Sequence, residues 1–103
     1  MKVVWTPRAQ TRLRAIRDYI RQETGNTQIA DRVVRMLVSK SKRLSWPGMA
    51  RSGRAVLEYQ HPDVLELLIA PYRLIYIVLP ARIDVLTVMH ERQLLPGDAD
   101  PTD

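Results

Sequence analysis

The chain has 103 residues, 46% of them hydrophobic, and a net charge of +5. This length fits one domain, and this apolar content excludes a disordered chain. The absence of cysteine excludes disulfides and thiolate chemistry and favours a cytoplasmic protein, and with only two histidines it disfavours a zinc site. No apolar run reaches the roughly 20 residues of a membrane span. We therefore expect no cofactor, metal or membrane partner.

The charge is distributed unevenly along the chain. Residues 1–55 contain 13 Lys and Arg against 3 Asp and Glu, a charge of +10, whereas residues 56–103 carry −5. Ten of those 13 cations are Arg, the side chain suited to planar recognition of phosphate or carboxylate. The pattern indicates nucleic acid or an acidic protein as a partner, and the alternative is a solvated basic surface.

The first elements along the chain are a short strand and two helices. Residues 1–6 predict the strand, and Thr6 followed by Pro7 is typical of a helix start. Gly25 can end this helix, and Asn26 or Thr27 can cap the next, so the two helices should form an antiparallel hairpin. The apolar stripes of the two helices are Ala9, Leu13, Ile16 and Ile20, then Ala30, Val33, Val34, Leu37 and Leu44.

The second helix should end before Trp46, where Trp-Pro-Gly interrupts the pattern. We expect Leu13, Ile16, Val33 and Leu37 to be buried against a sheet. Trp46 and Met49 are also expected in the core, with a partner groove as the alternative.

The remainder of the chain predicts four short strands, at residues 54–59, 64–70, 72–79 and 83–89. The order β-α-α-β-β-β-β predicts an α+β domain over residues 1–96, with the hairpin on one face of a mainly antiparallel sheet. The strand 72–79 is apolar on both faces and should be central. The sequence offers little to cover the other sheet face, which is therefore predicted to bind a partner. Residues 97–103 are predicted to be a disordered acidic tail.

Arg73 lies inside this apolar strand and cannot lose its charge. An unpaired buried charge would cost more than a small domain can tolerate. Arg73 should therefore pair with Glu58 or Glu66 on a neighbouring strand, or else face a groove that admits an anion.

His90 follows the last strand. A histidine at this place can transfer protons near neutral pH, but a hydrogen-bonded structural role is the favoured interpretation.

Several motifs, in this order, resemble the RelE/ParE toxin superfamily of bacterial type II toxin–antitoxin modules. They are Pro47-x-Met49-x-Arg51-x-Gly53-Arg54, Leu65-Glu66-Leu67, Pro71-Tyr72-Arg73-Leu74-Ile75-Tyr76 and Val88-Met89-His90-x-Arg92. The resemblance covers nearly the whole chain. It implies a compact toxin that is neutralised by a cognate antitoxin in a hetero-oligomeric complex.

The superfamily contains two activities, and this chain resembles the ParE-like branch more. That branch implies inhibition of DNA gyrase by binding, without catalytic residues. The alternative is a RelE-like, metal-independent ribonuclease that cuts messenger RNA on the ribosome, for which Arg73, His90 and Arg92 would be the catalytic set. The basic stretch and Tyr expected after the last strand of a RelE-like enzyme are missing. A third possibility is an inactive relative that binds only the antitoxin.

The residues assigned to partner binding are mostly cationic. They are Arg51, Arg54, Arg73, Tyr76, His90 and Arg92.

Overall fold

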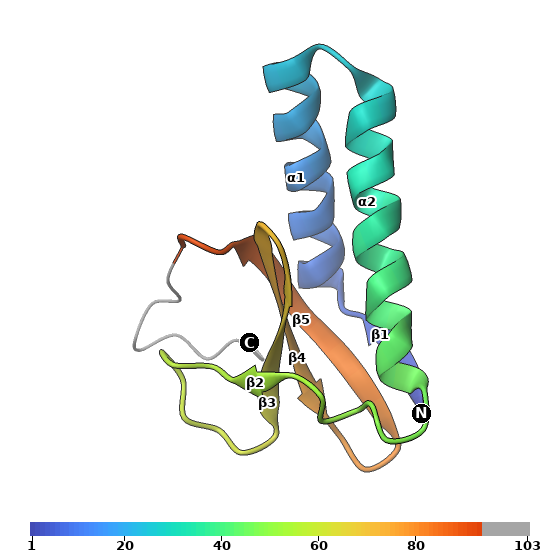
Figure 1. The fold of residues 1–103 in the computed structure, drawn as a ribbon, viewed down its shortest axis with the longest axis vertical. Helices are drawn as coiled ribbons and strands as arrows, with labels where there is room; N and C mark the ends of the chain where they lie inside the picture. The colour runs from blue at the N-terminus through green and yellow to red at the C-terminus, as the bar shows by residue number, and fades with distance from the viewer. Residues whose placement is uncertain (94–103) are drawn as a thin grey trace.

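The computed structural model describes residues 1–93, so the predicted tail at residues 97–103 lies outside the described part. Figure 1 shows a long helical hairpin rising from a twisted sheet. The elements are β1 (Lys2–Trp5), α1 (Pro7–Thr24), α2 (Thr27–Ser41), the 3₁₀ helix η1 (Lys42–Ser45), β2 (Arg54–Ala55), β3 (Val64–Ile69), β4 (Tyr72–Val78) and β5 (Arg82–His90). This is the predicted order, and the α+β fold class is confirmed.

The helix ends follow the predicted capping pattern. Thr6 Oγ1 accepts a hydrogen bond from the N–H of Ala9 at 3.2 Å, and the Thr6 hydroxyl donates to the carbonyl of Val85 at 2.8 Å. The cap of α1 is thereby fixed to β5. Gly25 ends α1 with a φ of 64°, a conformation that glycine adopts without strain. The side-chain oxygen of Asn26 then accepts from the backbone N–H groups of Gln28 and Ile29 at the start of α2.

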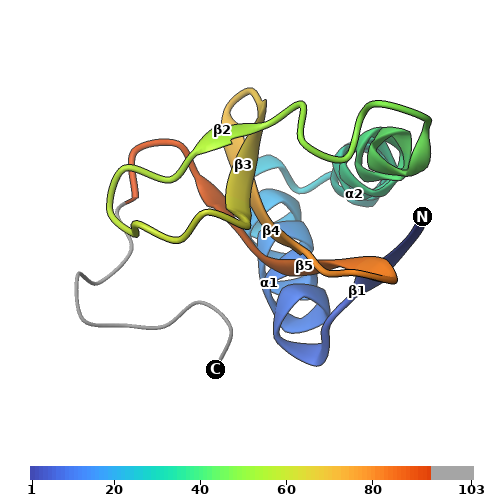
Figure 2. The same ribbon diagram turned by 90° about the horizontal axis from the view of Figure 1, so that it is seen from below.

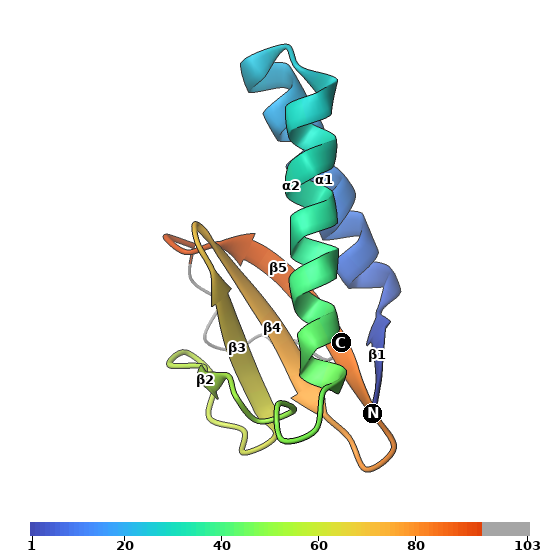
Figure 3. The same ribbon diagram turned by 45° about the vertical axis from the view of Figure 1, so that its right-hand side comes forward.

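The sheet has the strand order β1-β5-β4-β3-β2. β1 runs parallel to β5, and the other neighbouring pairs are antiparallel. β4 is central, as its two apolar faces predict. Figure 3 shows the C-terminal part of α2 lying over the sheet, while the other end of the hairpin projects beyond it.

The core on the hairpin face explains which helix residues are buried. Leu37 is fully buried, as predicted, among side chains such as Leu74, Tyr76 and Val85. Leu13, Ile16 and Val33 pack against this core but are only partly buried. The predicted burial of these three residues is therefore confirmed in part.

The opposite face of the sheet is covered, which corrects the prediction of an open apolar face. The predicted strand 54–59 stops after Ala55, and the chain turns back on itself, with the N–H of Tyr59 donating to the carbonyl of Val56 at 3.1 Å. Val56 and Tyr59 pack on a second cluster that contains Ile75 and Leu86. Figure 2 shows the chain between β2 and β3 on the side of the sheet away from α2. We call residues 56–63 the covering loop.

Within residues 1–93, no helix is long and apolar enough to cross a membrane.

Candidate functional site

Arg73 is held in an internal ion network. Its exposed fraction is 5%, and its Nε donates to Glu66 Oε2 at 2.6 Å. Its Nη1 and Nη2 donate to the two carboxylate oxygens of Glu58 at 2.7 and 2.8 Å, and Nη1 also donates to the carbonyl of Gln93 at 2.8 Å. The hydrogen bonds to Glu58 are the main cause of a raised pKa for Arg73. The predicted pairing is confirmed with both acids.

The network connects four parts of the chain. Arg73 belongs to β4, Glu66 to β3, Glu58 to the covering loop, and Gln93 to the turn after β5. Arg54 of β2 extends the network to the surface, with its Nε 2.9 Å from Glu66 Oε1 and its side chain 63% exposed. Arg73 therefore anchors the loop and the turn to the sheet.

Tyr76 is also an internal residue. It is fully buried on the hairpin face, and its hydroxyl oxygen accepts a hydrogen bond from the N–H of Gly53 at 3.0 Å. Burial is the main cause of a raised pKa for Tyr76. A Cβ atom on Gly53 would lie 2.5 Å from the Tyr76 hydroxyl and 2.6 Å from the carbonyl oxygen of Glu66. The Tyr76 hydroxyl and the Glu66 carbonyl therefore leave no room for a side chain at position 53, and this position requires glycine.

His90 lies on the opposite face of the sheet from Arg73. In the β4–β5 register Tyr72 pairs with His90 and Arg73 pairs with Met89. Directly paired residues point to the same face, and successive residues point to opposite faces. The ring of His90 contacts Tyr72 edge-to-face, with centroids 6.2 Å apart, and its Nδ1 accepts from the N–H of Arg92 at 3.2 Å. The structure does not bring Arg73 and His90 together.

His90 contributes to a groove of about 350 Å³ between α1 and the adjacent ends of β4 and β5. Arg12 and Tyr19 from α1 form one wall, and Tyr72 forms part of the other. Tyr19 is 64% exposed, and burial is the main cause of a raised pKa for Tyr72. This α1 groove presents aromatic side chains and one cation to solvent.

A second groove, of about 180 Å³, lies between the C-terminal end of α2 and β3. We call it the β3-edge groove; it is lined by Lys40, Arg43, Leu44, Met49, Ser52, Leu67, Leu68 and Ile69. Met49 thus lines a groove wall, whereas the sequence favoured a core position for it. This groove combines apolar residues with cations.

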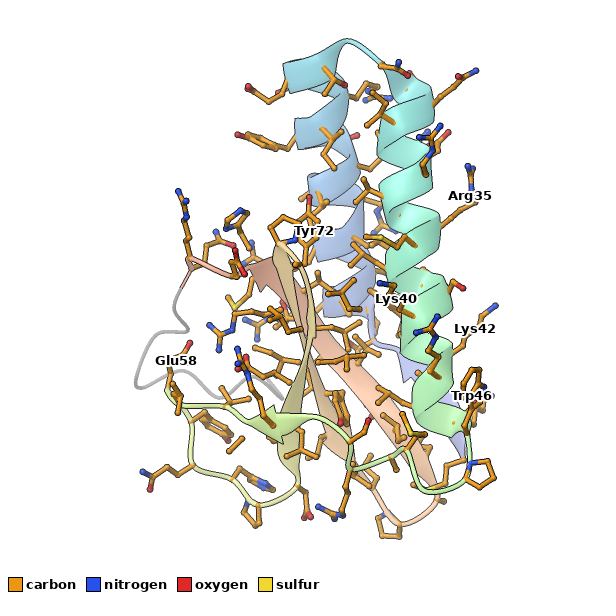
Figure 4. The ribbon with its side chains drawn as sticks, in the orientation of Figure 1. Arg35, Lys40, Lys42, Trp46, Glu58 and Tyr72 are labelled. Atoms are coloured by element: carbon orange, nitrogen blue, oxygen red, sulfur yellow. The ribbon has the colours of Figure 1, made fainter. Side chains whose placement is uncertain are left out.

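Trp46 lies in the sequence between the groove residues Leu44 and Met49. It is 57% exposed, so the prediction that it is a core residue was wrong. The guanidinium of Arg43 lies 6.0 Å from the centroid of its ring. η1 ends at Ser45, and the chain then turns through Gly48, whose φ is 78°. This turn leaves the indole outside the core, as Figure 4 shows.

The other residues assigned to partner binding are on the surface. Arg51 is exposed and forms an ion pair with Asp63 at 2.7 Å, and Arg92 is exposed in the turn after β5. Arg73 and Tyr76 present almost no surface to a partner in this conformation. Within residues 1–93, no group of three or more His, Asp or Glu side chains is placed to hold a metal ion.

Comparison with known proteins identifies the family. Residues 3–95 match the family described as ParE toxin of type II toxin-antitoxin system, parDE. A solved structure described as the chromosomal ParDE TA system from P. aeruginosa contains a chain that is 26% identical, with a TM-score of 0.73 over 87% of this chain and 95% of that one. No curated protein matches the chain significantly. The chain belongs to the ParE toxin family of type II toxin–antitoxin systems.

Proposed function

We propose that this toxin inhibits DNA gyrase by binding to it and is neutralised by a cognate ParD antitoxin. The toxin role follows from the family, and membership of a parDE system implies the ParD partner. The choice of gyrase over the ribosome is the proposal, and it depends on where the candidate catalytic residues lie.

The observation that carries the proposal is the separation of Arg73 from His90. Cleavage of RNA by its own 2′-hydroxyl needs a proton-transfer group and a cation that stabilises charge at one phosphate. Here the two side chains point to opposite faces of the sheet. Arg73 is bound by two carboxylates, so a phosphate would have to displace Glu58 or Glu66 to reach it. Both features favour a toxin that inhibits its target by binding over one that cleaves RNA.

The partner surface follows from the charge distribution. The +10 charge of residues 1–55 suits an acidic antitoxin segment. We assign contacts to surface cations such as Arg51, Arg54 and Arg92 and to the accessible edge of His90. Complementary charge should make association fast and sensitive to salt. Arg73 and Tyr76 would contribute indirectly, by holding the surface in shape.

The experiment gives purified toxin to gyrase with relaxed plasmid and, in parallel, to a ribosome programmed with messenger RNA. We expect inhibition of supercoiling and an uncut messenger. Site-specific cuts that disappear in a folded His90→Ala variant would overturn the proposal in favour of the ribonuclease. If the toxin binds its antitoxin but affects neither target, the chain is an inactive relative.

A further inference from the structure

The outer edge of β3 is only partly covered by β2. β2 has two residues, and they pair with Leu65 and Glu66. All six residues of β3 pair with β4 on the other side. Among the described residues, no strand pairs with the outer edge of Leu67, Leu68 and Ile69. A partly unpaired edge of this kind can accept a strand from another chain.

The register indicates which backbone groups are free at this edge. Ile69 and Tyr72 close a two-residue turn, so they form the hydrogen-bonded pair, and the backbone groups of Ile69 point toward β4. The direction alternates along a strand, so the N–H and C=O of Leu68 point outward. The position of Glu66, two residues earlier, supports this direction. The carbonyl oxygen of Glu66 points outward as well, since it lies on the β2 side near Gly53. Within residues 1–93, no partner is found for these groups of Leu68.

The β3-edge groove runs beside this free edge and has two kinds of lining. Leu67 and Ile69 belong to the hairpin-face core, and they line the groove together with Leu44. Lys40 and Arg43 are the cations of its rim, and neither has a carboxylate partner among the described residues. Figure 4 shows Lys40 on the side of α2 that faces the sheet, whereas Arg35 and Lys42 point away from it.

Size and charge restrict the occupant. A volume of about 180 Å³ is below the roughly 300–1,000 Å³ of small-molecule pockets. It suits a few side chains of a peptide. A second copy of this chain, paired edge to edge, would bring two sets of Lys40 and Arg43 together, and like charges would oppose it. The occupant should therefore be an extended segment that carries carboxylates.

We propose that an acidic segment of the ParD antitoxin adds to the sheet as a strand along Leu67–Ile69, beyond the end of β2. Its backbone bonds the outward N–H and C=O of Leu68. Its apolar side chains, alternating along the strand, enter the groove beside Leu67 and Ile69, and its carboxylates pair with Lys40 and Arg43. The inference rests on the proposed neutralisation by ParD and is independent of the choice of gyrase as the target.

The first measurement is amide hydrogen exchange by NMR. The free toxin is compared with its complex with the co-expressed antitoxin encoded beside it. Strand addition should slow exchange of the Leu68 amide by about 100-fold or more, because a solvent-exposed N–H becomes part of a sheet. A helix docked in the same groove would leave this backbone amide unbonded.

The second measurement uses matched charge reversals on one helix. Lys40→Glu with Arg43→Glu should weaken antitoxin binding by about tenfold or more, since the reversed charges repel the acidic segment. The control, Arg32→Glu with Arg35→Glu, makes the same change of charge at exposed positions outside the groove. It should change the affinity by less than about threefold at physiological salt, because solvent and salt screen exposed charges.

The outcomes separate the two proposals. A stable complex in which Leu68 exchanges as fast as in the free toxin overturns strand addition and leaves neutralisation by ParD intact. Equal losses of affinity in the two double variants show diffuse attraction and also overturn the groove assignment. The absence of any complex overturns both.

Discussion

The two faces of the sheet are buried by different means. On the hairpin face, two helices supply apolar side chains such as Leu37 and Leu44, and the core is continuous. On the other face, within residues 1–93, the covering loop packs on the strands, with Val56 and Tyr59 as its apolar contacts. The ion network of Arg73, Glu58 and Glu66 completes the attachment of that loop.

This difference explains why Arg73, a charged residue, has a structural role on the loop-covered face. A short loop buries too little apolar surface to hold itself on the sheet, and a guanidinium with several fixed donors can connect separate segments. Arg73 performs this role on the face opposite the helical hairpin. A buried arginine in an apolar strand is therefore not by itself a sign of catalysis.

The largest effect is expected on the loop-covered face. Arg73→Met removes the cation that bridges Glu58 and the buried Glu66, so the free energy of unfolding should fall by about 3–5 kcal/mol. Urea denaturation measures this loss. Arg21→Met, which breaks an exposed pair with Asp18, is the control and should change little. Equal stability of the two variants would show that the network does not hold the loop.

A smaller effect is expected on the hairpin face. Leu37 is fully buried, so Leu37→Ala should cost about 2–5 kcal/mol through lost contacts and a residual cavity. Leu13 is half-buried where the hairpin begins to leave the sheet, and Leu13→Ala should cost clearly less. Thermal or urea unfolding of the two variants compares them. A larger loss for Leu13→Ala would contradict the proposed position of the core.

The smallest effect concerns Tyr76 and appears only at alkaline pH. Burial raises the pKa of Tyr76 in the folded state, so the folded protein keeps this proton at a pH where the unfolded chain releases it. Stability should be unaffected by this group below its ordinary pKa of 10.0 and should fall as the pH rises above that value. Tyr76→Phe should reduce the slope of that fall. An unchanged slope in denaturant titrations would contradict the assignment.

The fold could be predicted from the sequence because local signals agree with each other. Thr6-Pro7 and Gly25-Asn26 mark the helix ends, and the helical stripes give way to short β-rich segments after Gly48. The pairing of Arg73 could be predicted as well, because a fixed charge in an apolar strand needs an acid, and Glu58 and Glu66 lie on adjacent segments.

The missed features depend on tertiary context. The segment after Ala55 has strand-like residues, but it leaves the sheet because Val56 packs on β4 and β5. Trp46 is exposed because of the turn that follows η1. The separation of Arg73 from His90 depends on strand register, and a shift of one residue would reverse the face on which a side chain lies. The β3-edge groove depends on where β2 ends, which the sequence did not define.

The most direct test of action by binding is the activity of His90→Ala in gyrase supercoiling, with folding checked by circular dichroism. If the toxin acts by binding, the variant should inhibit gyrase at nearly the same concentration as the wild type, because binding requires no proton transfer by His90. Loss of a general acid or base would instead lower a rate by about 10²–10⁴. If folded His90→Ala loses toxicity together with a messenger-cleaving activity that the wild type shows, the account is contradicted.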